Sequence, residues 1–515
     1  MTERPTRVWW RDPWLWICAA AAGRHAVGAW RLRQTMAFLA QAPPADPSGE
    51  EHPTLHLVVP VLWEQAHVGA AVRWFAELMR ELPGSTLTIV TTAREERERE
   101  YLVDDVAGCT SRMITARRFP QLTPDQLRTL VAAAQAGPRG RLTHDAAVSV
   151  VLRARLTCDV VADLLHYPDL ADVPIRHVHY AGAGRKAAQV NFAVARLDGA
   201  ADGDYIAVYD VDSRPDLVLV RHTLGYVAER RQADGELPAV VQQSAVFATR
   251  GAAGRAWQRH VCRGSARLQT LWTVRREIPS FRRYTAATRR PSGVALIDAT
   301  RRGLAQTVGH GLLVRLDVYR EMGGLPEYTV LDDLPFGYQL TAAGVPVHVA
   351  PVMSSAPAPE TVTDLISTHR RWFHNYLDYP ACAVAARRAG HGTLAEHAIA
   401  LCVAGYRAAT WMLSSPATAA CALTLLRRTT SPHARMFAGA ALWLGCATPV
   451  RMLAASQADR PSWATQVRDA VEIFAAYLIK SIGPIAAIAQ ATVPAKGFAP
   501  APKTHRRGPH PEEQG

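Results

Sequence analysis

The stretch Tyr205-Ile-Ala-Val-Tyr-Asp-Val-Asp-Ser-Arg-Pro-Asp216 is an apolar run that ends in two acidic residues one position apart. The run predicts a buried strand, and strand alternation predicts that Asp210 and Asp212 point the same way at the open end of a sheet. Two carboxylates this close repel each other unless a cation lies between them. Because oxygen ligands suit Mg²⁺ or Mn²⁺ bridging to phosphates, the stretch indicates a site for a metal and a diphosphate.

An Asp-x-Asp triplet by itself is usually part of a solvated turn, so its neighbours must decide the interpretation. Upstream lies Gly182-Ala-Gly-Arg-Lys186, followed over 187–195 by apolar residues at helical spacing. A glycine-rich turn that opens a helix brings backbone N–H groups and the charges of Arg185 and Lys186 toward an anion. The alternative is an ordinary helix cap with two solvated basic residues.

Downstream, Val308-Gly-His-Gly311 precedes an apolar strand over 312–314, and Val330-Leu-Asp-Asp-Leu-Pro-Phe-Gly-Tyr-Gln-Leu340 follows. Asp332 and Asp333 are expected to open a short helix, where the helix dipole stabilises negative charge. They are either simple capping residues or include a general base that deprotonates a hydroxyl.

A further motif, Thr368-His-Arg-Arg-Trp372, lies in a helix expected from Thr361 to Tyr376. Arginine beside tryptophan supplies a cation for a departing diphosphate and a flat apolar face for a sugar ring. The alternative is an interfacial anchor on a helix near a membrane.

In order and spacing, these motifs resemble the membrane-associated family 2 glycosyltransferases, the group that includes cellulose, chitin and hyaluronan synthases and non-processive relatives. The resemblance spans roughly 56–376. It implies an α/β fold with a GT-A-type nucleotide-sugar-binding sheet flanked by helices, and N- and C-terminal membrane-associated helices. It also implies inverting transfer of a sugar from a nucleotide-diphosphate sugar donor to a lipid or glycan acceptor, with Mg²⁺ or Mn²⁺.

The family's first motif, Pro-x-x-Asn-Glu, is matched by Leu57-Val-Val-Pro-Val-Leu-Trp-Glu64. The resemblance therefore places Glu64 on the nucleotide side, with Trp63 in place of the usual asparagine. The family's glycine-Lys-x-x-x-x-Asn helix is matched by Lys186 and Asn191, which are implied to bind the nucleotide-sugar; Arg185 separates the glycine from the lysine.

By the same resemblance Asp210 and Asp212 bind the metal, Asp210 also contacts the nucleotide-sugar, and the Glu-Asp pair of the family maps to Asp332 and Asp333, with Asp333 as the catalytic base. The Gln-x-x-Arg-Trp signature maps to 368–372.

The signature keeps Arg371 and Trp372, which are implied to bind the nucleotide-sugar. Thr368 stands where the processive enzymes have glutamine, which favours transfer of a single sugar.

Two other classes of function stay open from the sequence. One is a non-catalytic membrane scaffold that keeps the fold, because Thr368 departs from the signature and 88–95 lacks the Asp-rich nucleotide-base loop of relatives. The other is a nucleotidyltransferase with the same kind of acidic metal site and attack at phosphorus. His310 between two glycines is either a packed turn residue or a residue that helps to select the sugar.

The chain of 515 residues is long enough for one large domain and an accessory region. Apolar strands at 55–61, 86–92, 205–209 and 239–247 alternate with helical patterns, which indicates an α/β sheet covered by helices on both faces. We expect an N-terminal membrane-proximal helix and linker over 1–50, a catalytic domain over 51–380 with an insertion at about 94–174, a C-terminal helical membrane region over 381–494, and a disordered tail over 495–515.

The formal net charge is +13, with arginines spread along the whole chain and no legible nucleic-acid module. An anionic membrane surface and a nucleotide-sugar explain this charge, and nucleic acid is not expected as a partner. The eight cysteines contain no Cys-x-x-Cys, so neither a zinc site nor a disulfide framework is implied. We expect a protein of the cell membrane whose catalytic domain faces the reducing cytoplasm.

Four apolar segments predict membrane contact: 14–30, 408–426, 436–450 and 471–493. The second segment contains Pro416 and the fourth contains Glu472 and Lys480. If the second and third segments formed a spanning hairpin and the catalytic domain were cytoplasmic, the loop between them would place Arg427, Arg428 and Arg435 on the outer side of the membrane. This is against the positive-inside tendency. Spanning helices, interfacial helices and an ordinary buried helical domain are therefore all open.

Overall fold

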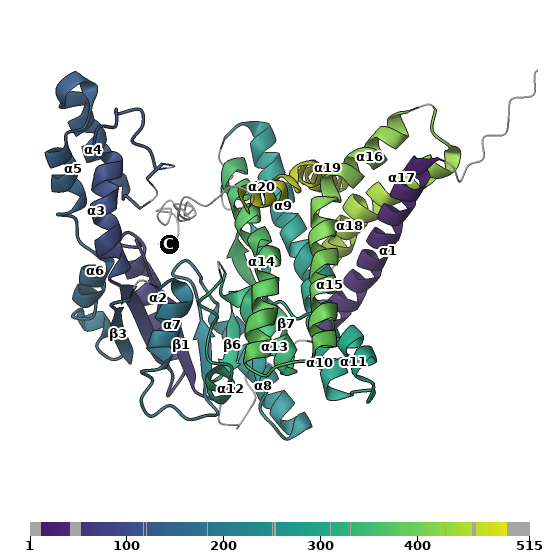
Figure 1. The fold of residues 1–515 in the computed structure, drawn as a ribbon, viewed down its shortest axis with the longest axis horizontal. Coiled ribbons are helices and arrows are strands. Elements are labelled where there is room, and N and C mark those ends of the chain that lie inside the picture. Colours follow the sequence, from purple (N-terminus) through teal and green to yellow (C-terminus); the bar gives the residue numbers. More distant parts are fainter. Residues whose placement is uncertain are drawn as a thin grey trace, which may run out of the picture. The chain divides into compact units, whose positions relative to one another are not determined.

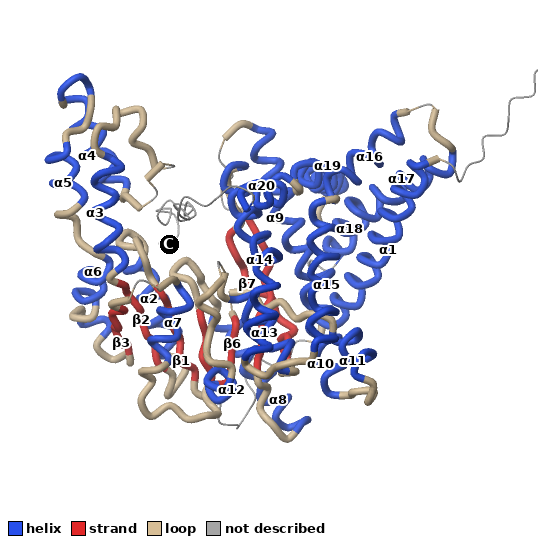
Figure 2. The backbone as a smooth tube through the Cα atoms, viewed as in Figure 1, coloured by secondary structure: helices blue, strands red, loops and turns tan. Residues whose placement is uncertain are grey.

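The computed structural model describes residues 12–41 and 53–491, apart from 117, 120, 183, 250, 252–253, 310, 330, 428 and 456–459. The expectations for the C-terminal tail and for His310 fall outside the described residues. Figure 1 shows the chain as a ribbon and Figure 2 its helices and strands.

The strands are β1 (Leu55–Pro60), β2 (Thr86–Thr92), β3 (Ile175–Tyr180), β4 (Tyr205–Val208), β5 (Val240–Ala248), β6 (Leu312–Arg315) and β7 (Val347–Pro357). The α-helices up to the last strand are α1 (Pro13–Leu39), α2 (Val68–Arg80), α3 (Arg94–Val106), α4 (Pro124–Ala136), α5 (His144–Val151), α6 (Thr157–Leu164), α7 (Lys186–Val194), α8 (Leu217–Asp234), α9 (Ala256–Trp272), α10 (Ile278–Arg289), α11 (Ala295–Arg302), α12 (Leu316–Glu321) and α13 (Asp333–Ala343). The later ones are α14 (Val362–Arg388), α15 (Leu394–Met412), α16 (Ser414–Leu426), α17 (Pro432–Leu442), α18 (Thr448–Ala455), α19 (Trp463–Ile479) and α20 (Ile482–Ala491). Short turns of other helix types are η2 (Pro138–Gly140), η3 (Pro168–Leu170), and the π-helical η4 (Thr273–Glu277) and η5 (Trp443–Ala447).

The seven strands form one sheet in the order β3-β2-β1-β4-β6-β5-β7, and helices flank it. The predicted α/β class is therefore confirmed, and the four strands expected from apolar runs are all present. Strands β1 to β4 run parallel, while β6 is antiparallel to both β4 and β5. The strand order reverses between β1 and β4, which makes this position a topological switch point, where α/β sheets bind ligands beside the carboxyl ends of the strands.

Strands β1 and β4 are buried along their whole length. Their continuous apolar sequences fit this position, because a strand covered on both faces cannot expose an alternate polar side chain. Helix α7 packs on β1, β2 and β3, while α2 and α6 pack on β2. The packing of α7 on these strands thus fixes the position of its first residue relative to the sheet.

The chain forms two compact units. The nucleotide-side unit, our name for the first, comprises the described residues within 45–242 and 307–336; the helical unit comprises those within 1–44, 243–306 and 337–499. The chain passes from one unit to the other within β5. These units do not follow the boundaries expected from the sequence, and the expected division into domains stays a prediction.

The expected insertion at about 94–174 contains four helices, α3 to α6. It has a hydrophobic cluster of its own, to which Leu102, Val106, Leu130 and Val151 contribute. Trp63, from the loop after β1, packs against this cluster. The insertion is therefore a folded layer that supports one of the loops at the switch point.

In the helical unit, α1 packs along α17 and also contacts α16 and η4. Two continuous helical segments, Pro432–Ala455 and Trp463–Ala491, are long and apolar enough to cross a membrane. The segment expected at 408–426 is not one straight helix: α15 and α16 meet at Leu413 with a bend of 46°. Pro416 explains the break, because proline cannot donate a hydrogen bond to the carbonyl of Met412 and its ring clashes there.

Candidate functional site

Four segments of the nucleotide-side unit meet one edge of the sheet. Strands β1 and β4 are parallel neighbours, and Val208 at the end of β4 pairs with Leu312 at the beginning of β6. The loops that follow β1 and β4 and the glycine-rich loop that precedes β6 therefore leave the sheet at the same edge, around the switch point. Helix α7, which follows the parallel strand β3, begins near this edge as well.

The acidic pair lies in a turn beyond the strand. Strand β4 ends at Val208, and the Ser213 N–H donates to the Asp210 carbonyl at 2.8 Å. The expectation that strand alternation orients the pair is therefore wrong, since the strand ends before it. Asp210 and Asp212 are nevertheless both exposed on either side of the buried Val211, so the turn presents both carboxylates to solvent.

Lys186 brings the acidic segments together. It is the first residue of α7, and its ammonium lies 2.8 Å from Asp210 Oδ1 and 3.7 Å from Asp332 Oδ2. Burial alone would lower the pKa of Lys186, but the charges of Asp210, Asp332 and Asp333 together raise it above its ordinary value. The lysine is therefore a fixed cation, surrounded by more negative charge than it can neutralise.

Asp332 and Asp333 lie at the start of α13, as expected. The Asp333 carboxylate accepts hydrogen bonds from the backbone N–H groups of Leu334, at 2.9 Å, and Gly309. Burial first and the charge of Asp332 second raise the pKa of Asp333 to about 6, against the opposing effect of Lys186. A carboxylate with such a pKa is poised to accept a proton near neutral pH.

Gly309 was not predicted as a site residue. A Cβ atom at this position would lie 3.1 Å from Asp333 Oδ2 and 3.5 Å from Lys186 Nζ. The absence of a side chain therefore keeps the space beside Lys186 and Asp333 open. It also lets the Gly309 backbone come within hydrogen-bonding distance of the Asp333 carboxylate. The Thr307 hydroxyl, two residues earlier, donates to the Asp333 carbonyl at 2.5 Å and ties this loop to α13.

Glu64 begins the turn that leads into α2 and is buried. Its backbone N–H donates a hydrogen bond to the Thr157 hydroxyl oxygen at 3.2 Å. The preceding Trp63 has φ of +59°, a left-handed conformation that asparagine adopts more readily than tryptophan. Two carboxylates of α3 hold it: Glu95 accepts from the Trp63 backbone at 3.3 Å and Glu98 accepts from its indole at 2.9 Å. Sequence reasoning missed both glutamates, because the contact joins residues more than thirty positions apart.

Asn191 makes four hydrogen bonds within the protein. Its Oδ1 accepts from the Tyr319 hydroxyl at 2.6 Å and the Leu325 N–H at 2.8 Å, and its Nδ2 donates to the Leu325 carbonyl and to Glu327. Gly324, at φ +81°, permits this approach, since a Cβ there would lie 2.5 Å from Asn191 Oδ1. The side chain thus fastens α7 to the loop before α13, and its expected contact with a nucleotide-sugar stays a prediction.

Arg371 and Trp372 lie on α14, in the helical unit. Helix α14 is longer than expected and continues through Pro380 to Arg388. Arg371 is exposed, and Trp372 is half-buried with its ring 6.0 Å from that of His369. Their roles in nucleotide-sugar binding stay predictions.

The described residues contain no group of three or more His, Cys, Asp or Glu side chains that could hold a metal ion. A cation between Asp210 and Asp212 would therefore complete its coordination with oxygens of a ligand or of water. This is typical of Mg²⁺ and similar ions, which one or two carboxylates and substrate phosphates hold.

No protein-family model and no curated protein sequence matches this chain. Among solved structures, it is similar to "Mannosyltransferase PcManGT from Pyrobaculum calidifontis in complex with GDP-Man and Mn2+". The two chains share 15% sequence identity, and the match covers 89% of this chain and 98% of that chain with a TM-score of 0.44.

Proposed function

We propose that this protein is an inverting glycosyltransferase of the membrane-associated family 2 kind, which transfers a sugar from a nucleotide-diphosphate sugar to a lipid or glycan acceptor. The observation that carries the proposal is the contact of Lys186 with Asp210 and Asp332, because it joins three separate sequence motifs at the switch point of the sheet. Coincidental motifs would have no reason to converge on one lysine.

The diphosphate of the donor would lie against Lys186 and the exposed pair Asp210 and Asp212. Both carboxylates offer oxygen ligands, so the residues fit Mg²⁺ or Mn²⁺, which when bound would neutralise charge on the departing nucleoside diphosphate. Lys186 supplies a second positive charge from the protein itself, and its ion pairs hold that charge in place before the donor arrives.

Asp333 is the proposed base. At pH 7 a carboxyl with a pKa of about 6 is mostly ionised, so it can take the proton from the acceptor hydroxyl as that oxygen attacks the anomeric carbon. The N–H groups of Leu334 and Gly309 fix its orientation. Asp332 holds Lys186 near Asp333 through its own ion pair with the lysine, and its charge raises the pKa of Asp333.

Glu64 and Asn191 are proposed to shape the donor site from the nucleotide side, and Arg371 and Trp372 to contact the leaving diphosphate and a sugar ring. The two apolar helical segments support the proposal that the protein acts at the cell membrane with its catalytic residues on the cytoplasmic side.

Metal-dependent hydrolysis of a panel of nucleotide-sugars by the detergent-solubilised full chain tests this function. We expect nucleoside diphosphate to be released from one donor with Mg²⁺ or Mn²⁺, and not by the Asp212→Ala variant. Release of pyrophosphate would identify a nucleotidyltransferase instead. If no donor is cleaved, calorimetry with nucleotide and Mn²⁺ decides, since absence of metal-dependent binding would leave the scaffold as the function.

A further inference from the structure

Among the described residues of the helical unit, a group of positive side chains forms no ion pair with a carboxylate. Arg24 from α1, Arg275 and Arg276 from the π-helical turn η4, and Lys480 after α19 all act on the His25 side chain through their charges. Together with burial, which is the largest effect, they lower the pKa of His25 to about 3. We call these four cations the basic cluster.

Other arginines of the same unit are paired with acids. Arg263 and Arg267 of α9 form ion pairs with the buried Glu472, and Arg267 also pairs with Asp469 at 2.7 Å. Among the described residues, by contrast, no member of the basic cluster has an ion pair, and neither the Arg276 guanidinium nor the Lys480 ammonium has a hydrogen bond. The acidic partners thus neutralise Arg263 and Arg267, while no described carboxylate forms an ion pair with the basic cluster.

Arg275 shows the imbalance at atomic level. Its side chain is only 7% exposed, its Nη2 donates to the Leu444 carbonyl at 3.2 Å, and its Nε is buried with no hydrogen-bond partner. Gly28 of α1 makes room for it, since a Cβ there would lie 3.5 Å from Arg275 Cδ. Burial and the charge of Arg24 lower the pKa of Arg275. A buried guanidinium whose Nε has no hydrogen-bond partner is costly unless something else supplies an acceptor.

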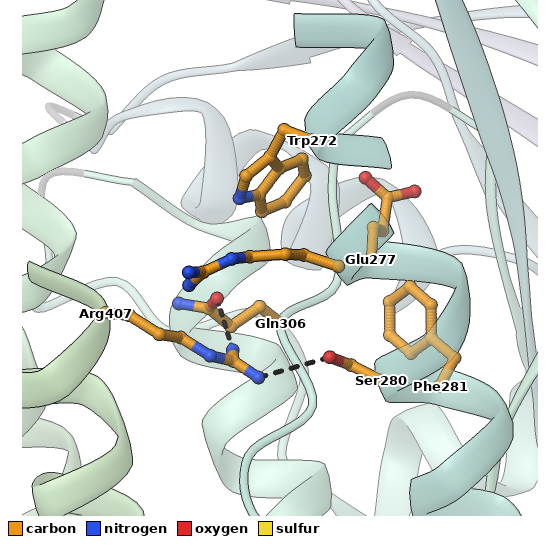
Figure 3. Close-up of a pocket in the computed structure, with 7 residues that line it drawn as sticks. Trp272, Glu277, Ser280, Phe281, Gln306 and Arg407 are labelled. Carbon is orange, nitrogen blue, oxygen red and sulfur yellow. Dashed lines mark hydrogen bonds between the residues drawn. The ribbon is translucent and has the colours of Figure 1, made fainter. Parts of the chain in front are cut away.

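The carboxylate that lines a small cavity with Arg276 does not serve as that acceptor. Glu277 follows Arg276 in the chain and lines the same small cavity, together with Arg407. Figure 3 shows its carboxylate directed away from Arg407, which instead donates to Gln306 and Ser280. Glu277 accepts a hydrogen bond from Ser244 at 2.8 Å, and burial raises its pKa to about 7. Burial therefore disfavours the negative charge of Glu277, and its carboxylate is hydrogen-bonded to Ser244.

An apolar groove begins beside Arg275. Leu444, which accepts its hydrogen bond, belongs to η5, and Cys446 of the same turn lines the groove. The groove measures about 450 Å³ and is lined, apart from Arg451 and Gln466, by apolar side chains such as Trp443, Val450, Val471 and Phe474. The hydrogen bond from Arg275 to Leu444 thus links the two π-helical turns found in the described residues, and such turns are frequent at functional sites.

We propose that the basic cluster and this groove form a binding site for a membrane lipid with a phosphate headgroup. The phosphate supplies the acceptor oxygens that Arg275 and Arg276 lack, through charge-assisted hydrogen bonds, and its acyl or isoprenoid chain lies along the groove. Charge complementarity selects an anionic lipid, and the adjoining groove selects a lipid over a free phosphate. The site is independent of the proposed glycosyl transfer.

Isothermal titration of the detergent-solubilised full chain with dioctanoyl phosphatidic acid tests the proposal. Dioctanoylglycerol, with the same chains and no phosphate, and inorganic phosphate are the two comparison probes. We expect phosphatidic acid to bind at least tenfold more tightly than either. If dioctanoylglycerol binds as tightly as phosphatidic acid, the basic cluster does not recognise the headgroup. If inorganic phosphate binds as tightly, the ligand is not a lipid.

The double variant Arg276→Gln/Lys480→Gln is expected to lose at least tenfold in affinity for phosphatidic acid, while Arg388→Gln, an exposed arginine at the end of α14, keeps wild-type affinity. Both altered side chains are half-buried and make no hydrogen bond with the described residues, so the double variant should fold, and its thermal unfolding in the absence of lipid checks this. Relief of repulsion should leave the lipid-free double variant at least as stable as the wild type. Wild-type lipid affinity in a folded double variant would refute the site.

Discussion

Asp333→Asn should make the protein more stable at neutral and alkaline pH while it abolishes sugar transfer. The pKa of this carboxyl is raised from 3.8 to about 6 by burial and by Asp332. Because the folded state holds the proton more tightly than the unfolded chain, the stability that this group contributes is complete below about pH 4 and is lost as the pH rises through about 6. At 1.36 kcal/mol for each pKa unit, the ionised carboxylate costs about 3 kcal/mol above pH 7.

Asparagine has nearly the same shape, and its Oδ1 can still accept the hydrogen bond from Leu334, but it carries no charge to desolvate. Thermal unfolding of the detergent-solubilised chain, followed by tryptophan fluorescence, should show a higher midpoint for the variant at about pH 8 and little difference at about pH 4. At about 2–4 °C for each kcal/mol, the upper limit is about 6–12 °C. Asp104→Asn, a side chain that is 76% exposed, is the control and should shift neither midpoint.

The two halves of this prediction can fail separately. A variant that gains no stability at about pH 8, or gains as much at about pH 4, would show that the carboxylate is not held in the environment described here. A variant with the expected stability that still transfers sugar at the wild-type rate would refute only the assignment of Asp333 as base, since loss of a general base lowers rates by about 10²–10⁴-fold.

Three further outcomes follow from the same geometry. Lys186→Met should weaken donor binding and move the acid limb of the activity profile to higher pH, because the variant loses the charge that lowers the pKa of Asp333; an unmoved limb in a pH–rate profile would contradict this. Asp212→Ala should remove the dependence of donor hydrolysis on Mn²⁺, measured by titration of the metal; retained metal activation would exclude this residue as a ligand. Asn191→Ala should lower the unfolding midpoint by the equivalent of about 2 kcal/mol, because four hydrogen bonds, three of them partly buried, are lost; a change in donor KM alone would instead assign Asn191 to binding.

The sheet could be predicted from the sequence because its central strands are short apolar runs bounded by turn residues. The runs at 55–60 and 205–208 read as buried strands, and both are buried along their length. Lys186, Asp210 and Asp332, which belong to three motifs of the sequence, lie together in the structure, although nothing in the local sequence sets the distances between them. Those distances depend on strand order, which places β4 beside β1 and β6.

The rest could not be predicted, because it depends on contacts between distant segments. The four hydrogen bonds of Asn191 reach residues about 130 positions away. The motif around Asn191 therefore could not predict that this side chain holds α7 to the loop before α13. The position of Trp63 depends on glutamates that lie within the insertion. The break at Leu413 could have been predicted from Pro416, because proline interrupts the hydrogen bonding of a helix at a known distance.

Both units contain like charges held together without enough opposite charge in the protein. Around Lys186, three carboxylates influence one ammonium, and the surplus is negative. Around His25, the four cations of the basic cluster influence one neutral imidazole, and the surplus is positive. Each arrangement costs folding free energy, because charges of one sign repel at short range in a partly buried site. A ligand that brings the missing charge removes this cost when it binds, so such sites favour a cation in the first case and an anion in the second. The sign of the surplus therefore predicts that metal should stabilise the nucleotide-side unit and anionic lipid the helical unit, each by an effect that the other ligand does not reproduce.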